Sequence, residues 1–222
     1  MSLFEFLKGN FFHVAPILVV GAIAAAIILE RTWALVYHYP MKHVPQFFDK
    51  LRDLVMADKL AEAISLCDRY KTKPVAHVVR EALLRAHQPE PLIQDGLEIA
   101  VSEASEQIQK RTSYLSSIAN VATLLGLLGT IVGLIKSFEA VGSAAAQQRS
   151  ALLAEGISTA MNATMLGLAV AIPCMIAYSF LINRTNRLNA EVDRSAVRIL
   201  DLINQRFYSA DDHGKSGIQK AV

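Results

Sequence analysis

Charged residues are missing from two long stretches in the second half of this chain. No Asp, Glu, Lys or Arg occurs over 112–135 or over 156–183. A helix of about 20 apolar residues is long enough to cross the hydrocarbon core of a bilayer. Neither stretch has the plain Leu, Ile and Val composition of a helix that faces only lipid, because Gly, Ala and Thr recur along both. Such small and hydroxyl-bearing residues let neighbouring helices pack closely and line a polar path.

Cysteines and recognisable catalytic motifs are also scarce. The two cysteines, Cys67 and Cys174, are far apart in the sequence and suggest neither a disulfide framework nor a metal site. The sequence contains no phosphate-binding Gly-rich loop and no framework of Ser, His and Asp. We therefore predict that the protein is not an enzyme, that it holds no metal and that it needs no cofactor.

The distribution of positive residues predicts how the chain crosses the membrane. A third apolar stretch covers 9–29, and it is expected to be a retained first span because no small-residue cleavage site follows it. Lys and Arg number 1 before this span, 12 over 30–111, 2 over 136–155 and 7 after the third span. Since Lys and Arg favour cytoplasmic loops, the N-terminus is expected outside and the C-terminus in the cytoplasm.

These patterns divide the chain into eight predicted segments. They are an outside N-terminus (1–10), transmembrane helix 1 (11–30), a cytoplasmic helical domain (31–111), transmembrane helix 2 (112–136), an outside, periplasmic loop (137–155), transmembrane helix 3 (156–182), a cytoplasmic helix (183–208) and a flexible tail (209–222).

Prolines and glycines are unevenly spread along the chain. No Pro occurs between Pro91 and Pro173, and no Gly occurs between Gly96 and Gly126. Because these two residues are the main local helix breakers, we expect one continuous helix over 92–135.

The region between the first two spans reads as a small helical domain. Its apolar residues recur at helical spacing, with a break near Asp58 and a helix start at Pro74. The third span is expected to continue into an amphipathic helix with an apolar stripe over 188–203. The predicted fold is an all-α membrane protein whose long helices extend into a helical cytoplasmic domain. A single copy would expose these stripes, so we expect self-association.

Polar and small residues gather on one face of each of the last two spans. The second span carries Asn120, Thr123 and Thr130, and the third carries Thr164. We interpret these side chains as an ion pathway, although a Thr hydroxyl can instead bond to a carbonyl of its own helix. The glycines predicted to allow close helix packing are Gly126, Gly129, Gly133 and Gly167.

Two further features of the spans bear on mechanism. Pro173 lies inside the third span and is read either as a hinge or as a tolerated structural proline. Apart from Glu30 and Lys136 at their ends, the spans contain no carboxylate, Lys or Arg. A proton relay needs a titratable group in the membrane, so either this protein moves no protons or a partner helix supplies the acid.

Three motifs resemble the MotA/TolQ/ExbB family of proton-channel motor proteins. They are AIILERTWAL within 24–35, LLGLLGTIVGLIKSF over 124–138 and EGISTAMNATMLGLAVAIPCMIAY over 155–178. The last two fit the family patterns of its second and third spans. The three spans and the large loop after the first one resemble the TolQ/ExbB branch. One departure is Ala122-Thr123, where many members have a Pro.

The resemblance implies an assembly and a mechanism. It implies a homopentamer around two copies of a single-span partner of the ExbD/TolR type, which carries the membrane Asp that this chain lacks. It implies that Thr130 and Thr164 face that Asp, and that proton motive force drives mechanical work on an envelope or outer-membrane client. Clients within this branch include transporters, envelope constriction and gliding motility. The translocated ion is expected to be a proton, with sodium as an alternative, and a non-conducting scaffold of the same fold is the second hypothesis.

Overall fold

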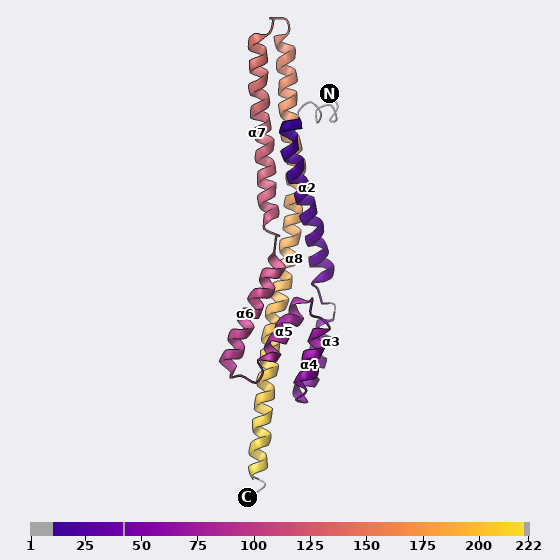
Figure 1. Cartoon of the computed structure of the whole chain (residues 1–222), viewed down its shortest axis with the longest axis vertical. Helices are drawn as coiled ribbons and strands as arrows, with labels where there is room; N and C mark the ends of the chain where they lie inside the picture. The colour runs from indigo at the N-terminus through magenta and orange to yellow at the C-terminus, as the bar shows by residue number, and fades with distance from the viewer. Residues whose placement is uncertain (1–10, 42, 220–222) are drawn as a thin grey trace. The chain divides into compact units, whose positions relative to one another are not determined.

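The computed structural model describes residues 11–41 and 43–219, and its side chains over 14–41 and 43–208. The described residues are helical and contain no strand. The elements are helix α2 (Phe11–Trp33), a π-helix (Ala34–His38), α3 (Val44–Met56), α4 (Leu60–Asp68), α5 (Pro74–Leu84), α6 (Glu90–Gln109), α7 (Tyr114–Ser143) and α8 (Arg149–Gln219) (Figure 1). They form two compact units: a three-helix unit (11–32 and 111–182) and a helical domain (33–110 and 183–219).

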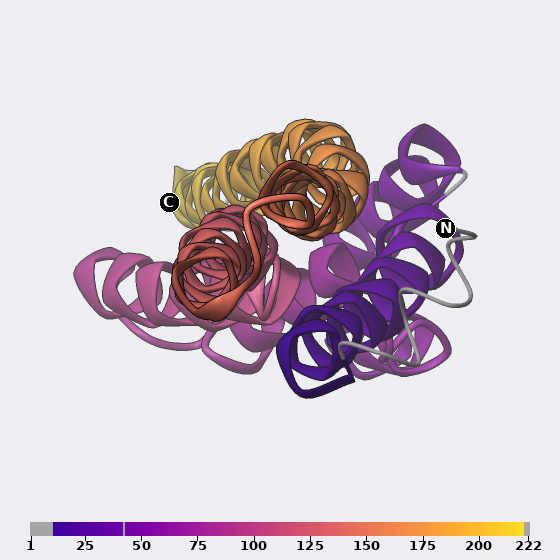
Figure 2. The same cartoon turned by 90° about the horizontal axis from the view of Figure 1, so that it is seen from above.

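The three-helix unit consists of α2, α7 and the first part of α8. Both views show α7 beside this part of α8 (Figures 1 and 2). Helix α2 packs on α8 as well: a β-carbon added at Gly21 would lie 3.1 Å from Cγ2 of Val170, and Val14 and Ala163 belong to one buried cluster. Small side chains therefore bring the three helices together.

Many large apolar side chains lie on the outside of this unit. Leu124, Phe138 and Ile176 are 63%, 62% and 67% exposed. Helices α2, α7 and α8 each contain a segment that is long and apolar enough to cross a membrane. A helix with an apolar outer face suits a hydrocarbon surrounding, so the composition and the packing agree with the three predicted spans.

The helical domain has a conventional aliphatic and aromatic core. Helix α3 buries Phe47 and Leu51, α5 buries Val78 and Val79, and the second part of α8 buries Ile199. Asp58 has a φ of 61° between α3 and α4, and Pro74 is the first residue of α5. The break and the helix start predicted from the sequence are thus confirmed.

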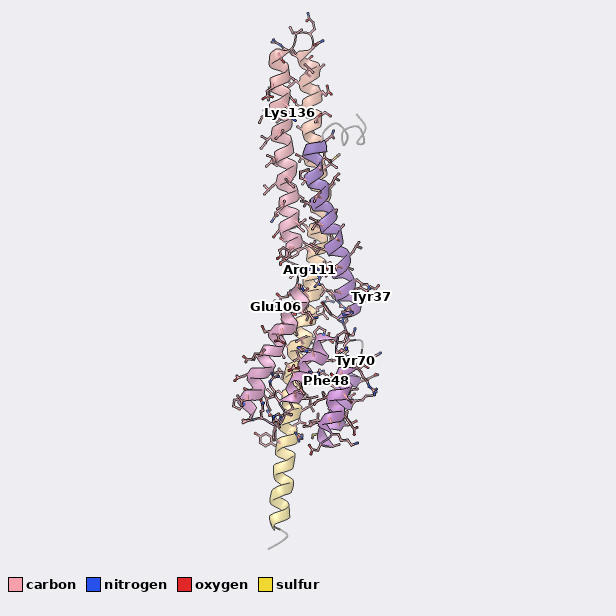
Figure 3. The ribbon with its side chains drawn as sticks, in the orientation of Figure 1. Tyr37, Phe48, Tyr70, Glu106, Arg111 and Lys136 are labelled. Carbon is pink, nitrogen blue, oxygen red and sulfur yellow. The ribbon has the colours of Figure 1, made fainter. Side chains whose placement is uncertain are left out.

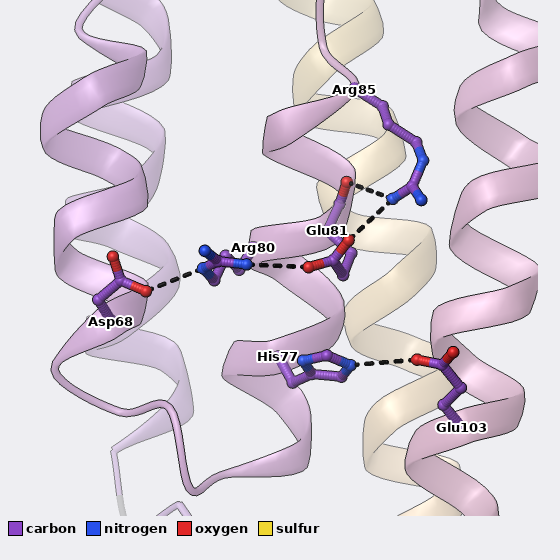
Figure 4. Close-up of polar contacts among 6 residues, drawn as sticks. All are labelled: Asp68, His77, Arg80, Glu81, Arg85 and Glu103. Atoms are coloured by element: carbon purple, nitrogen blue, oxygen red, sulfur yellow. Dashed lines mark hydrogen bonds and ion pairs between the residues drawn. The ribbon is translucent and has the colours of Figure 1, made fainter.

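Ion pairs connect the helices of this domain at its surface (Figure 4). The Arg80 guanidinium of α5 donates from Nε to Oδ1 of Asp68 on α4 over 2.8 Å, and this contact raises the pKa of Arg80. Arg80 and Arg85 also donate to the two carboxylate oxygens of Glu81, over 2.9 and 3.0 Å. Pairs as exposed as these contribute little stability, so the apolar core holds the domain together.

The prediction of one helix over 92–135 was wrong. Helix α6 ends at Gln109 and α7 begins at Tyr114. Lys110 has extended backbone angles (φ −43°, ψ 129°) and Arg111 has a φ of 63°, which a helix cannot accommodate. No Pro or Gly marks this break. Arg111 instead donates from Nη1 to Oε2 of Glu30 over 2.7 Å, so a contact from a distant part of the chain is made where the helix stops.

Helices also continue across two of the sequence-based segment boundaries, and the positions of these boundaries in the membrane stay a prediction. The outside loop was expected over 137–155, but α7 continues to Ser143 and α8 starts at Arg149. The tail was expected to be flexible from 209, but α8 continues to Gln219. Residues with good helix propensity, such as Ala, Gln and Leu, flank the loop, and the absence of an apolar stripe in the tail does not by itself end a helix.

Candidate ion pathway

Glycines at the contact between α7 and α8 let the two backbones approach closely. A β-carbon at Gly167 would lie 2.7 Å from the carbonyl oxygen of Ala122 and 2.8 Å from Cα of Gly126. A β-carbon at Gly126 would lie 3.1 Å from Cα of Gly167. These distances leave no room for a side chain at Gly167, and at Gly126 a side chain would require the α8 backbone to move by a few tenths of an ångström.

Two more glycines of α7, one and two helical turns after Gly126, also lie against α8. A β-carbon at Gly129 would lie 2.7 Å from Cβ of Ala163, and one at Gly133 would lie 3.0 Å from Cβ of Ala160. The structure therefore places all four glycines predicted to pack helices at the contact between α7 and α8.

Two threonine hydroxyls meet at this contact. Oγ1 of Thr130 on α7 and Oγ1 of Thr164 on α8 are hydrogen-bonded to each other. The Thr130 hydroxyl is also 3.1 Å from the carbonyl oxygen of Gly126 and 3.5 Å from that of Ala160. The Thr164 hydroxyl reaches the same Gly126 oxygen over 3.3 Å. Both threonines are half-buried.

The number of protons in this cluster matters for its chemistry. Each hydroxyl has one proton to donate and two lone pairs to accept with. Four oxygens can accept the two protons: the two hydroxyls and the carbonyls of Gly126 and Ala160. The two protons can therefore be arranged in more than one way. One hydroxyl can turn its proton or its lone pair toward an incoming carboxyl group while the contact between the helices is kept. A pair of hydroxyls is suited to holding a carboxyl group in either protonation state.

The other two predicted pathway residues do not join this pair. The Thr123 hydroxyl donates to the carbonyl oxygen of Ala119 on its own helix over 3.0 Å. Asn120 is exposed on α7. Pro173 lies inside α8 and is exposed. A role of Asn120 or Thr123 in an ion path, and of Pro173 as a hinge, stays a prediction.

Ser137 adds a polar contact toward the end of α7 that was not among the predicted site residues. Its side chain is 5% exposed, and Oγ donates to the carbonyl oxygen of Gly133 over 2.7 Å. A β-carbon at Gly156 would collide with this side chain. The signal in the sequence was the position of Ser137 seven residues after Thr130, which places both on one face of α7.

A charged cluster lies at the other end of the three-helix unit. Glu30 accepts from Arg111, as described above, and from Nη2 of Arg31 over 3.1 Å. Arg31 is 3% exposed, and within the described chain its Nε and Nη1 have no hydrogen-bond partner; the same holds for Oγ1 of Thr112. Glu30 and Arg31 directly follow the apolar run of the first span. The burial of Arg31 was not foreseen, because a charge after an apolar run is usually exposed.

Among the described residues no group of His, Cys, Asp and Glu could hold a metal ion. The two cysteines are buried. In the helical domain, burial raises the pKa of the Cys67 thiol to about 12, so this thiol stays protonated and acts as a small apolar side chain.

Three apolar helices in contact through small residues, with paired hydroxyls between two of them, define a helical membrane protein with a polar element inside its bundle. Comparison with known proteins gives the family. The model of the MotA/TolQ/ExbB proton channel family matches residues 69–194. The chain belongs to this family.

Relatives from several organisms are similar to this chain. A protein described as a homologue of the biopolymer transport protein ExbB, from Methanothermobacter thermautotrophicus, is 31% identical over 150 residues, which are 68% of this chain and 51% of that protein. The Tol-Pal system protein TolQ of Haemophilus influenzae is 28% identical, over 56% of each chain. The chain thus matches about half the length of these relatives. The biopolymer transport protein ExbB of Neisseria gonorrhoeae is 27% identical, over 86% of this chain and 94% of that protein.

A solved structure, that of C. jejuni MotAB, has a similar fold. It superposes with a TM-score of 0.57 over 85% of this chain and 73% of that chain, at 15% identity. At this identity the likeness concerns the fold alone. It supports the all-helical architecture with long helices.

Proposed function

We propose that this chain is the membrane-embedded channel subunit of an ion-driven motor of the TolQ/ExbB type. In this proposal it converts proton motive force into mechanical work on a client in the envelope or outer membrane. The observation that carries the proposal is the hydroxyl pair of Thr130 and Thr164, which lies between two apolar helices and contacts no acid of this chain in the described structure.

The acid is proposed to come from a partner. The charge-free stretches of this chain contain no Asp or Glu. A carboxyl group is the side chain that most simply carries a proton across a membrane interior. A single-span protein of the ExbD/TolR type with a membrane Asp would place that carboxyl against Thr130 and Thr164. Two copies of this partner inside a homopentamer of the chain complete the proposed complex.

The proposed topology follows the distribution of Lys and Arg. The N-terminus and the connection over 144–148 face outside, and the helical domain with the C-terminus is in the cytoplasm. In this proposal the complex lies in the bacterial inner membrane. The charged, water-exposed surface of the helical domain agrees with a cytoplasmic location. A Na⁺-driven stator is the nearest alternative, because hydroxyl oxygens also coordinate Na⁺, and a non-conducting scaffold is the second.

The composition of the native complex tests this proposal. The complex should be extracted in mild detergent from its own membrane, and its native mass measured with each component identified. We expect five copies of the 24.3 kDa chain with two copies of a small single-span protein that has an Asp or Glu in its span. In liposomes this complex should carry protons, and the chain alone should not. An oligomer of another order, or a partner without a membrane acid, would support the scaffold instead.

A further inference from the structure

A positively charged cavity lies within the helical domain. Its volume is about 310 Å³, and the residues that line it include Lys50 on α3, Lys73 before α5, and His43. The described lining residues include no Asp or Glu. A concave site with two ammonium groups and no counter-charge in its wall favours an anionic ligand.

The two lysines are positioned differently. Lys73 is half-buried, and its Nζ donates to the carbonyl oxygen of His38 over 2.5 Å. An ammonium group has three donors, so this bond fixes Lys73 and leaves two donors for a ligand. Lys50 is exposed, and its flexible stem lets the charge follow a ligand into the cavity.

Aromatic and apolar side chains form the rest of the wall. The rings of Phe47 and Tyr70 pack edge to face, 5.9 Å apart. Tyr37 and Tyr70 lie at the same edge of the domain (Figure 3), and they are 73% and 41% exposed. Met41 and Leu66 complete an apolar side. A ligand that fits this wall has an anionic group and an apolar part.

The position of Tyr37 in the chain indicates where such a ligand is found. The first candidate span covers Val14–His38, so Tyr37 belongs to its last turn. Trp33, one turn earlier, is 63% exposed. Trp and Tyr are enriched at the level of lipid headgroups, where their rings face the apolar region and their polar atoms face water. The cavity therefore begins where the first span ends.

We propose that this cavity binds the phosphate of an anionic phospholipid, with the phosphate on Lys50 and Lys73 and the start of the acyl chains against Met41, Phe47 and Leu66. A soluble phosphate ester offers the same phosphate chemistry, but it leaves the apolar wall and the exposed tyrosines unused. This part of the proposal rests on the proposed topology, which places the cavity at the cytoplasmic leaflet. Anionic lipids are abundant in that leaflet.

Lipid binding to the purified full chain tests this proposal. Native mass spectrometry in detergent should measure the retention of added phosphatidylglycerol and of phosphatidylcholine. We expect Lys50→Gln to weaken phosphatidylglycerol binding about fivefold. The double variant Lys50→Gln with Lys73→Gln should weaken it further, because the two lysines attract the anionic headgroup by similar free energies. Phosphatidylcholine retention should stay low throughout.

The matched control is Lys71→Gln, which removes the same charge from the turn before α5 but does not line the cavity. An equal loss in this variant would overturn the proposal, because it would indicate a general effect of net charge. Displacement of the lipid by millimolar inorganic phosphate would also overturn it, in favour of a soluble phosphate ligand. If Lys73→Gln disturbs the fold through the lost bond to His38, the phosphatidylglycerol binding of Lys50→Gln alone tests the proposal. None of these outcomes depends on ion flux, so this proposal and the proposed function fail separately.

Discussion

The two units of this molecule are packed by opposite rules. In the three-helix unit small residues such as Gly126 and Gly167 make the closest helix contacts, and most large apolar side chains are exposed, with Ile17, Leu115 and Leu181 among the buried exceptions. In the helical domain Leu51 and Ile203 are fully buried, and ion pairs such as Arg80–Asp68 lie at the surface. The difference follows from the surroundings. Water drives large apolar groups inside, whereas lipid does not, so helices in a membrane associate through close backbone contact.

The largest expected effect comes from the core of the helical domain. Leu51→Ala should lower the free energy of unfolding by about 2–5 kcal/mol, because Leu51 is fully buried and the substitution leaves a cavity. Leu124→Ala in the three-helix unit should change it little, since Leu124 is 63% exposed and packs against no core. Thermal unfolding in detergent, followed by circular dichroism, measures both. Equal effects would contradict the opposite packing of the two units.

The reverse substitution tests the three-helix unit. Gly167→Ala should destabilise it by about 1–3 kcal/mol, because the new β-carbon would lie 2.7 Å from a backbone oxygen of α7. Gly142→Ala is the matched control on α7, since nothing lies within 4 Å of the added β-carbon there. Yield and thermal stability of the detergent-extracted protein separate the two variants. A Gly167→Ala protein as stable as Gly142→Ala would show that the α7 and α8 backbones are not in close contact.

A smaller effect is expected from the ion pair at the edge of the three-helix unit. Glu30 and Arg111 are both about half exposed, so their coupling should be about 0.2–1 kcal/mol. A double-mutant cycle with Glu30→Gln and Arg111→Gln measures it. Because both side chains are exposed to solvent, we expect the coupling to weaken as the salt concentration rises. A coupling of zero at low salt would mean that the break between these helices has another cause.

The smallest effect concerns pH. Burial raises the pKa of Glu191 on α8, although Arg194 and Arg184 act in the opposite direction. The folded state then holds this proton more tightly than the unfolded state, so stability falls as the pH rises above the ordinary value of 4.5. Glu191→Gln should therefore raise the melting temperature by about 1–3 °C at pH 7 and leave it unchanged at pH 4. A stabilisation of equal size at both values would exclude titration of Glu191 as its cause.

The sequence was informative where a pattern is local and uninformative where a contact is distant. The charge-free stretches and the recurring Gly and Thr predicted three apolar helices and put Thr130 and Thr164 on the small-residue face of each helix, because helical periodicity decides which residues share a face. That both threonines meet at one site was implied by the family resemblance. The break near Arg111 could not be predicted, since no Pro or Gly marks it. The burial of Arg31 could not be predicted either, because a charge that follows an apolar run is usually exposed.

Proton flux through the Thr130 and Thr164 variants tests the central claim most directly. The chain and its partner should be co-purified, reconstituted into liposomes, and assayed as wild type, Thr130→Val, Thr164→Val and Thr159→Val. Valine keeps the shape of threonine without its hydroxyl. Thr159 lies on α8 about 140° around the helix from Thr164 and serves as the control. We predict intact complexes in every case, with flux lost in the first two variants and kept in the third. Unchanged flux in both Thr130→Val and Thr164→Val would contradict the account.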